Sequence, residues 1–153
     1  MKKISYGKNV YDTQEISAVN NTLKKSTQMG KAVILFENKI AKYFSKKFGL
    51  MVNSGSSALT LAFKVLNLPK GSEVITPCLN FGTAVSSIVQ AGLKPIFVDC
   101  EKETLQINIS NIPKSITKKT KALLIPNLIG NIPNWKKIKV LAKKYNLQII
   151  EDS

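Results

Sequence analysis

The chain has 153 residues, a length that suits a single domain with enough core to fold by itself. Its hydrophobic content of 44% and charged content of 21% are ordinary for a soluble globular protein, and its apolar runs are too short to span a bilayer. The N-terminal residues lack the apolar segment of a secretion signal, and Cys78 and Cys100 lack metal-ligand spacing. These features predict a cytoplasmic protein without metal or membrane segment, in which both thiols are reduced and buried.

The net charge of +14 comes from lysine alone, because the chain contains no arginine. Arginine supplies most of the bidentate contacts by which proteins read bases and phosphates. The lysines are also spread along the whole chain as pairs rather than gathered in one run. This pattern favours a solvated lysine surface over a nucleic-acid surface, and it leaves open the attraction of an anionic or phosphorylated substrate.

Residues 1–49 show helical patterns and no strand pattern. The run Asp12–Glu15 is a capping signal for a helix that extends to about Lys25, and residues 26–30 break that helix. The stretch Val33–Phe48 predicts a second amphipathic helix whose inward residues are Phe36, Ile40, Tyr43 and Phe44. We therefore expect residues 1–49 to form an N-terminal helical arm that packs on the rest of the chain or on a partner subunit.

From residue 50 onward, predicted strands and helices alternate at the spacing of βαβ units. The predicted strands are Leu50–Asn53, Glu73–Thr76, Pro95–Asp99, Lys121–Pro126 and Leu147–Glu151. The predicted helices are Ser57–Leu66, Gly82–Ala91, Ile109–Ile116 and Asn134–Tyr145. The strands are mostly continuous apolar runs, which is typical of a sheet covered on both faces. The sequence therefore predicts an α/β fold with an open, mostly parallel sheet and flanking helices, which binds ligands beyond the carboxyl ends of its strands.

Three segments at those strand ends have both structural and functional interpretations. The run Asn53–Ser57 can be a simple helix cap, or it can bind a phosphate at a helix N-terminus. Phe81 can be a core residue, or it can stack on a flat ring. Asp152 can cap a following helix, or it can keep a pyridine nitrogen protonated. Pyridoxal 5′-phosphate (PLP) carries both the phosphate and the pyridine nitrogen.

Together and in this order, the segments resemble the DegT/DnrJ/StrS family of sugar aminotransferases, which are fold-type I PLP-dependent enzymes. The resemblance extends over nearly the whole chain and includes the runs Gly71–Pro77, Ala91–Asp99 and Ile149–Ser153. It implies that residues 50–153 are an incomplete PLP-binding large domain. The implied cofactor-binding residues are Gly55, Ser56, Ser57, Phe81 and Asp152, of which Asp152 is also the catalytic acid paired with the pyridine nitrogen. Asn127 occupies a position where many members have histidine.

The resemblance implies an N-terminal fragment of a cytoplasmic aminotransferase that makes an amino sugar for surface polysaccharide or lipopolysaccharide. The implied substrates are a keto-sugar nucleotide and an amino donor such as glutamate, and the full-length enzyme is implied to be a homodimer. The alternative is a PLP- or PMP-dependent 3-dehydratase of 4-keto-6-deoxy sugar nucleotides, because residues 26–30 and 127–131 look more like that subgroup. The Schiff-base lysine of the family, or the histidine that replaces it in the dehydratases, lies beyond Ser153. A chain expressed alone at this length is expected to be inactive and poorly soluble, or to serve as a binding module.

Overall fold

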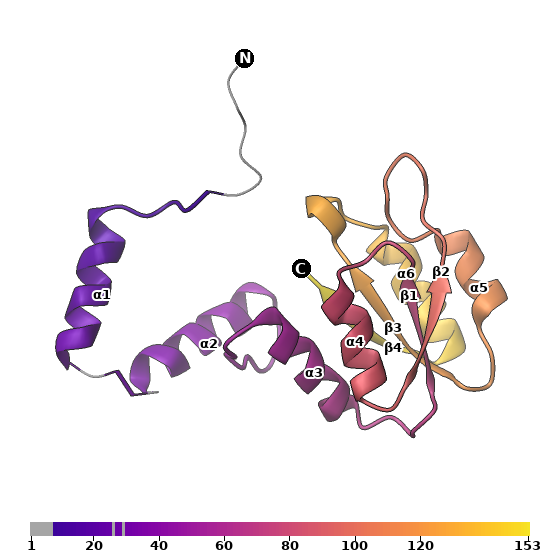
Figure 1. Cartoon of the computed structure of the whole chain (residues 1–153), viewed down its shortest axis with the longest axis horizontal. Helices are drawn as coiled ribbons and strands as arrows, with labels where there is room; N and C mark the ends of the chain where they lie inside the picture. The colour runs from indigo at the N-terminus through magenta and orange to yellow at the C-terminus, as the bar shows by residue number, and fades with distance from the viewer. Residues whose placement is uncertain (1–7, 26, 29) are drawn as a thin grey trace, which may run out of the picture. The chain divides into compact units, whose positions relative to one another are not determined.

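The computed structural model describes residues 8–25, 27–28 and 30–153. The chain divides into two compact units, Met1–Met51 and Val52–Ser153 (Figure 1). The first unit contains helices α1 (Thr13–Lys25) and α2 (Lys31–Tyr43). The break predicted at residues 26–30 includes Ser26 and Met29, which lie outside the described residues.

Helix α1 begins with the predicted capping interactions. The backbone N–H of Asp12 donates to Glu15 Oε2 at 2.8 Å, and the backbone N–H of Gln14 donates to Asp12 Oδ1 at 2.9 Å. These two bonds satisfy donors that have no acceptor within the first helical turn. The capping prediction is therefore confirmed.

Helix α2 is shorter and more exposed than predicted. It ends at Tyr43 rather than Phe48, because Ser45 adopts a left-handed backbone conformation with φ 52°. The apolar residues predicted to face inward are exposed, and Ala41 is the one buried residue of the helix. Exposed fractions of those predicted residues are 46% for Phe36, 39% for Ile40, 82% for Tyr43 and 57% for Phe44. The prediction of inward-facing residues is wrong for the described part of this unit, because none of its described residues buries these side chains.

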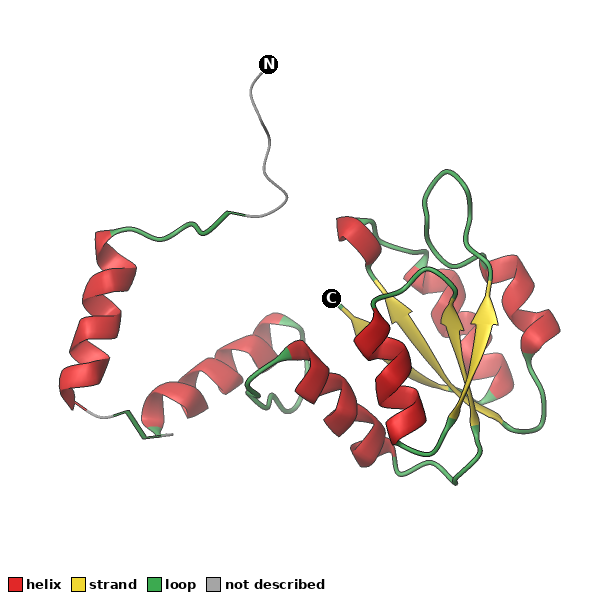
Figure 2. Cartoon of the chain, in the orientation of Figure 1, coloured by secondary structure: helices red, strands yellow, loops and turns green. Residues whose placement is uncertain are grey.

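The second unit is built on a four-stranded parallel sheet with the order β2-β1-β3-β4. The arrows of all four strands point the same way in Figure 2. The strands are β1 (Glu73–Pro77), β2 (Lys94–Val98), β3 (Thr120–Pro126) and β4 (Gln148–Asp152). The helices are α3 (Gly55–Leu66), α4 (Gly82–Gln90), α5 (Ile112–Ser115) and α6 (Trp135–Tyr145), with short 3-10 turns η1 (Ile109–Asn111) and η2 (Leu128–Gly130). The predicted parallel α/β fold is confirmed.

The sheet separates two apolar cores, because successive side chains of a strand point to opposite faces. On one face, Val74 packs with Leu59 and Phe63 of α3 and with Ile88 of α4. On the other face, the core combines strand residues with those of α5 and α6; its members include Ile75, Val98, Ile112, Leu123, Ile125, Ile138 and Ala142. Helices thus cover both faces, which explains why the strand sequences are continuously apolar.

The predicted strand Leu50–Asn53 is absent. No strand of the described residues pairs with this segment, and Leu50 is 73% exposed. A β-strand is stabilised by its hydrogen-bonded neighbour, so an apolar run without such a neighbour remains irregular. The segment leads directly into α3.

A buried carboxylate connects the starts of β1 and β3. Glu73 Oε2 accepts hydrogen bonds from Thr117 Oγ1 at 2.6 Å and from Thr120 Oγ1 at 3.1 Å. The Thr117 hydroxyl also accepts from the Lys119 backbone N–H at 3.0 Å. The register between β1 and β3 shifts between Glu73 and Val74, which marks a β-bulge in the pairing. The hydrogen bonds of Glu73 lie at this bulge and connect its two strands.

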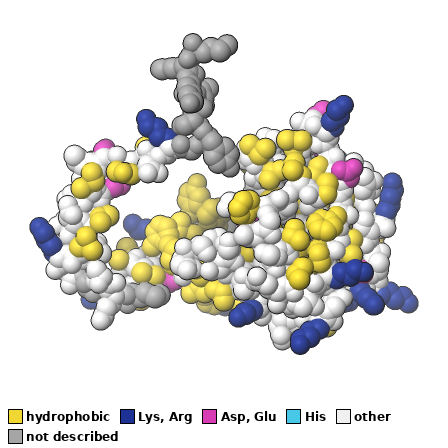
Figure 3. Space-filling view, viewed as in Figure 1, with side chains coloured by type: hydrophobic (Ala, Val, Ile, Leu, Met, Phe, Trp, Pro, Cys, Tyr) yellow, Lys and Arg dark blue, Asp and Glu magenta, His cyan; other side chains and the backbone are white. Residues whose placement is uncertain are grey.

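The surface is rich in lysine and in exposed apolar groups. In Figure 3, lysine side chains lie around the margin of the view, and apolar side chains are visible on both units. Within the described part of the chain, no helix combines the length and the apolar character needed to cross a membrane.

Candidate functional site

The candidate site lies at the carboxyl edge of the sheet, where β1, β2, β3 and β4 end. Helix α4 follows β1 and therefore begins at this edge. Helix α3 precedes β1 and packs against α4, and a turn of six residues joins its end to the start of β1. Its 12 residues are about 18 Å long. Because α3 runs back along the sheet and contacts β4, its N-terminus lies at the carboxyl edge too (Figure 2).

The N-terminus of α3 presents free backbone donors. Ser54 is the N-cap, and its side chain accepts a hydrogen bond from the Ser57 backbone N–H at 3.2 Å. The N–H groups of Gly55 and Ser56 precede any possible helical acceptor, and no acceptor among the described residues reaches them. A Cβ placed on Gly55 would meet no atom within 4 Å, so the space beside this first residue of the helix is open. An anion can therefore approach the positive end of the helix dipole here.

Phe81 stands at the N-cap of α4 and points away from the core, because 72% of the residue is exposed. Its backbone is held by Asn80, whose Oδ1 accepts from the Phe81 N–H at 2.8 Å and whose Nδ2 donates to Thr76 Oγ1 at 3.0 Å. The alternative of a core phenylalanine is thereby excluded. A large aromatic ring is left free to stack on a ligand.

Asp152 is the last residue of β4 and is half-buried. Its backbone carbonyl accepts from the Asn127 N–H at 2.8 Å. No donor among the described residues reaches its carboxylate, although Lys side chains are abundant elsewhere. The carboxylate oxygens are open to solvent, since no buried side-chain polar atom of the described residues lacks a partner, so a ligand donor can reach them.

Asn127, at the end of β3, belongs to a polar network that the sequence did not reveal. Its Oδ1 accepts from Trp135 Nε1 at 2.9 Å, and its Nδ2 donates to Glu151 Oε1 at 3.1 Å and to Ser153 Oγ at 2.6 Å. All the hydrogen-bonding atoms of this side chain are thus occupied within the protein. Through Glu151 and Ser153, Asn127 holds the residues on both sides of Asp152. Trp135 in turn holds the Asn127 side chain, although the helical pattern placed Trp135 only in an apolar stripe.

The two cysteines lie at the same edge, at the ends of β1 and β2. Both are free; Cys78 is exposed and Cys100 is half-buried, so the prediction of two buried thiols is wrong, most clearly for Cys78. The reason is that the chain leaves the sheet after Pro77 and turns outward. Local desolvation and the hydrogen bond to Asp99 nevertheless raise the pKa of the Cys78 thiol. Among the described residues, no group of three or more Cys, Asp, Glu or His side chains is arranged to hold a metal ion.

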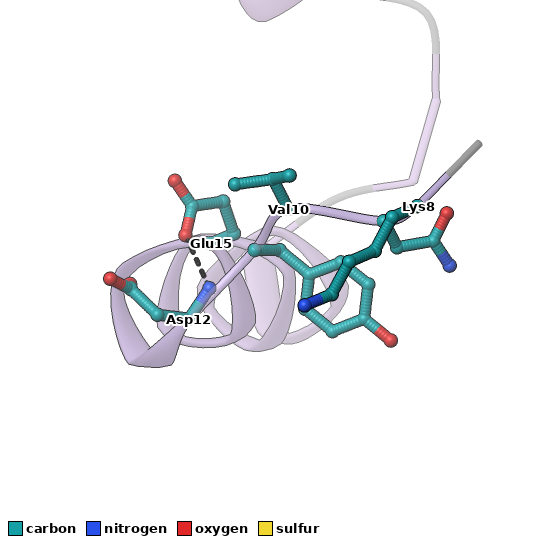
Figure 4. A pocket seen from close by; sticks show the side chains of 6 residues that line it. Lys8, Val10, Asp12 and Glu15 are labelled. Atoms are coloured by element: carbon teal, nitrogen blue, oxygen red, sulfur yellow. Dashed lines mark hydrogen bonds between the residues drawn. The ribbon is translucent and has the colours of Figure 1, made fainter. Parts of the chain in front are cut away.

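A separate hollow of about 330 Å³ lies beside the start of α1 in the first unit (Figure 4). Its lining includes Lys8, Val10, Asp12 and Glu15, all of which are exposed. Figure 4 shows that it is an open turn of the chain over the capping interaction between Asp12 and Glu15. It contains none of the predicted site residues, so the carboxyl edge remains the candidate site.

Comparison with curated proteins shows close relatives along the full chain. The chain is 36% identical over 151 residues to GDP-perosamine synthase of Escherichia coli O157:H7, covering 99% of this chain and 39% of that protein. It is 34% identical over 150 residues to GDP-4-keto-6-deoxy-D-mannose 3-dehydratase of Yersinia pseudotuberculosis, covering 94% of this chain and 38% of that protein. The chain therefore spans less than half the length of these relatives.

Solved structures agree with this result. A GDP-4-keto-6-deoxymannose-3-dehydratase with a trapped PLP-glutamate geminal diamine superposes with a TM-score of 0.92 at 32% identity, over 99% of this chain and 41% of that chain. The E. coli GDP-4-keto-6-deoxy-D-mannose-3-dehydratase with bound hydrated PLP gives a TM-score of 0.89 at 33% identity, over 95% of this chain and 39% of that chain. The sequence model of the DegT/DnrJ/EryC1/StrS aminotransferase family matches residues 9–153. The chain belongs to the DegT/DnrJ/EryC1/StrS aminotransferase family.

Proposed function

We propose that this chain is the N-terminal, cofactor-binding part of a PLP-dependent aminotransferase that acts on a keto-sugar nucleotide in surface polysaccharide or lipopolysaccharide biosynthesis. The observation that carries the proposal is the meeting, at one sheet edge, of free helix N–H groups with an unpartnered carboxylate. PLP has an anionic phosphate at one end of its pyridine ring and a protonatable nitrogen on the ring. The residues at this edge fit both groups.

Each residue has a distinct role in this proposal. The N–H groups of Gly55 and Ser56, with the hydroxyls of Ser56 and Ser57, bind the phosphate. The exposed ring of Phe81 stacks on the pyridine ring and fixes its plane. Asp152 holds the proton on the pyridine nitrogen. When bound, PLP supplies the electron sink on which an amino group can be transferred.

The closest functional alternative is a sugar 3-dehydratase on the same scaffold. It is favoured by the dehydratase structures that superpose on the chain and by the dehydratases among its curated relatives. The dehydratase relative and the perosamine synthase relative match the chain to nearly the same extent. In this proposal the two functions differ at the Schiff-base position of the full-length protein, beyond Ser153. A lysine there would support transamination, and a histidine would support dehydration.

The proposal extends to the assembly and to the arm. We expect the full-length enzyme to be a cytoplasmic homodimer with glutamate or a similar amino donor. In that dimer the helical arm of residues 1–49 would pack on the large domain of residues 50–153 or on the partner subunit. The exposed apolar residues of α2 are consistent with such a contact. Size-exclusion chromatography with light scattering on the full-length protein tests the dimer.

The phosphate site can be tested on the 153-residue chain. A Gly55→Leu substitution places a branched side chain before α3, and its Cβ has no protein atom within 4 Å, so we expect the fold to be kept while the phosphate is excluded. Gly82→Leu is a matched control, because Gly82 also opens a helix into free space. We expect inorganic phosphate to broaden in ³¹P NMR spectra with the wild-type chain and with Gly82→Leu, and at least ~10-fold weaker binding to Gly55→Leu. Equal phosphate binding by all three chains would contradict the assignment.

A further inference from the structure

The two cysteines of the chain are brought together by neighbouring strands. Cys78 follows β1 and Cys100 follows β2 by two residues, and the Cys78 N–H donates to the Val98 carbonyl oxygen at 2.9 Å. This bond continues the β1–β2 pairing by one residue beyond the sheet. The loops that carry both thiols are therefore held at a fixed separation by the sheet itself.

Asp99 links the two cysteines more directly. Its Oδ1 accepts from the Cys78 thiol at 3.5 Å and from the Cys100 backbone N–H at 2.8 Å. One carboxylate oxygen thus orients the Cys78 side chain toward the backbone of Cys100. The Cys100 thiol is also near enough to Cys78 to contribute to the raised pKa of Cys78. The chain has no other cysteine, and no disulfide joins these two.

We propose that Cys78 and Cys100 are a redox modification site, at which a peroxide converts the two thiols into a reversible intrachain disulfide. In the first step the Cys100 sulfur attacks hydrogen peroxide, the O–O bond breaks, and Cys100 becomes a sulfenic acid while water leaves. In the second step the Cys78 sulfur displaces the hydroxyl of Cys100, and the Cys78 proton leaves with it as water. Two thiols and one peroxide give one disulfide and two waters.

The order of the steps follows from the environment of Cys78 and from its hydrogen bond to Asp99. Local desolvation, the hydrogen bond to Asp99 and the neighbouring Cys100 raise the pKa of Cys78, so less of this thiol is ionised at neutral pH. Because the thiolate is the nucleophile, the proposal assigns the first reaction with peroxide to Cys100, although Cys78 is the more exposed of the two thiols. Cys78 then resolves the sulfenic acid, because Asp99 has already oriented it toward Cys100.

The disulfide would change the candidate site. Cys78 lies three residues before Phe81, so a bond to Cys100 ties the loop that carries this ring to the end of β2. It also removes the hydrogen bond from the Cys78 thiol to Asp99. The inference concerns only Cys78, Asp99 and Cys100, and it does not depend on the proposed function.

Intact-mass spectrometry of the reduced, dilute 153-residue chain tests the disulfide. After treatment with hydrogen peroxide, we expect a monomer that has lost two hydrogens and that regains them with dithiothreitol. We also expect the melting temperature to rise by roughly 5–10 °C, because a loop of about 20 residues is closed. Addition of two or three oxygens to single thiols, disulfide-linked dimers alone, or an unchanged mass would each overturn the proposal.

Single-cysteine variants test the order. In Cys78→Ser, a cyclic 1,3-diketone should trap a sulfenic acid on Cys100, and in Cys100→Ser the trapping at Cys78 should be at least ~5-fold slower. Adding Asp99→Asn to Cys100→Ser should speed trapping at Cys78, whereas the exposed control Glu103→Gln should not. Equal trapping in the two single variants, or no effect of Asp99→Asn, would refute the assigned roles.

Discussion

The buried carboxylate of Glu73 should contribute a large share of the stability of the sheet. Glu73→Gln keeps the size of the side chain and removes its charge. The carboxylate accepts two hydroxyl hydrogen bonds, and bonds to a charged acceptor contribute about 1.5–3 kcal/mol each. The amide oxygen can keep one neutral bond of about 1 kcal/mol. The difference is about 2–5 kcal/mol, and the desolvation of the buried carboxylate opposes it, so we expect the free energy of unfolding to fall by about 2 kcal/mol.

Thermal unfolding followed by circular dichroism measures this loss. At this chain length, about 2 kcal/mol corresponds to a decrease of roughly 4–8 °C in the melting temperature. Glu103→Gln is the matched control, because it makes the same change at an exposed position without a hydrogen-bond partner among the described residues. If Glu73→Gln melts within about 1 °C of Glu103→Gln, the network does not stabilise the bulge and the reasoning is wrong.

The same residue predicts an acid dependence. The hydrogen bond from Thr117 is the main reason why the pKa of Glu73 is lowered, with further lowering by Thr120 and by Lys94 and Lys119, against the opposing effect of burial. Since the folded pKa lies below the ordinary value of 4.5, this contribution to stability is complete above pH 4.5. It is lost as the pH falls through the folded pKa. Wild-type chain should therefore lose more stability than Glu73→Gln in acid, and parallel pH profiles would refute this.

Three further substitutions test the site and its surroundings. In the full-length enzyme, Asp152→Asn should keep the fold and PLP binding but lose most activity, because a neutral amide no longer favours the protonated pyridine; full turnover at saturating PLP would remove Asp152 from the site. Trp135→Phe should lower the free energy of unfolding by about 1 kcal/mol in urea titrations, because the bond to Asn127 is lost while the ring volume is largely kept; an unchanged midpoint would contradict the anchoring role. Ile129 is 78% exposed and has a left-handed backbone with φ 56°, which glycine adopts without strain. Ile129→Gly should therefore raise the free energy of unfolding by about 0.5–1 kcal/mol, and by more than Ile129→Ala does. A lower melting temperature for Ile129→Gly would show that the backbone at this position is not strained.

The elements of the second unit were predictable because their signals are local. Helices α3, α4 and α6 have apolar residues at helical spacing, and each of the four strands is a short apolar run followed by a turn or a polar residue. The errors arose where structure depends on a distant partner. Leu50–Asn53 has the composition of a strand but no neighbour, and the end of α2 depends on the left-handed conformation of Ser45.

Tertiary side-chain networks were not predictable for the same reason. Glu73 bonds to threonines that lie 44 and 47 residues further along the chain, and no sequence pattern relates them. The bond from Trp135 to Asn127 spans a loop and a 3-10 turn, so helical spacing indicated only the apolar side of Trp135. In contrast, the serine cap of α3 was visible in the sequence, because capping is an interaction over three residues.

The candidate site is distinguished by features that the fold alone does not explain. Phe81 is 72% exposed, the carboxylate of Asp152 has no donor among the described residues, and a Cβ on Gly55 would lie in open space. None of these features is unusual by itself, because the second unit also exposes other large apolar side chains, such as Val65 and Val140. Phe81, Asp152 and Gly55 belong to three different elements that all reach the same edge of the sheet. A ligand with a ring, a basic nitrogen and a phosphate would engage all three residues at once, so the proposed function rests on their combination at one sheet edge rather than on any one motif.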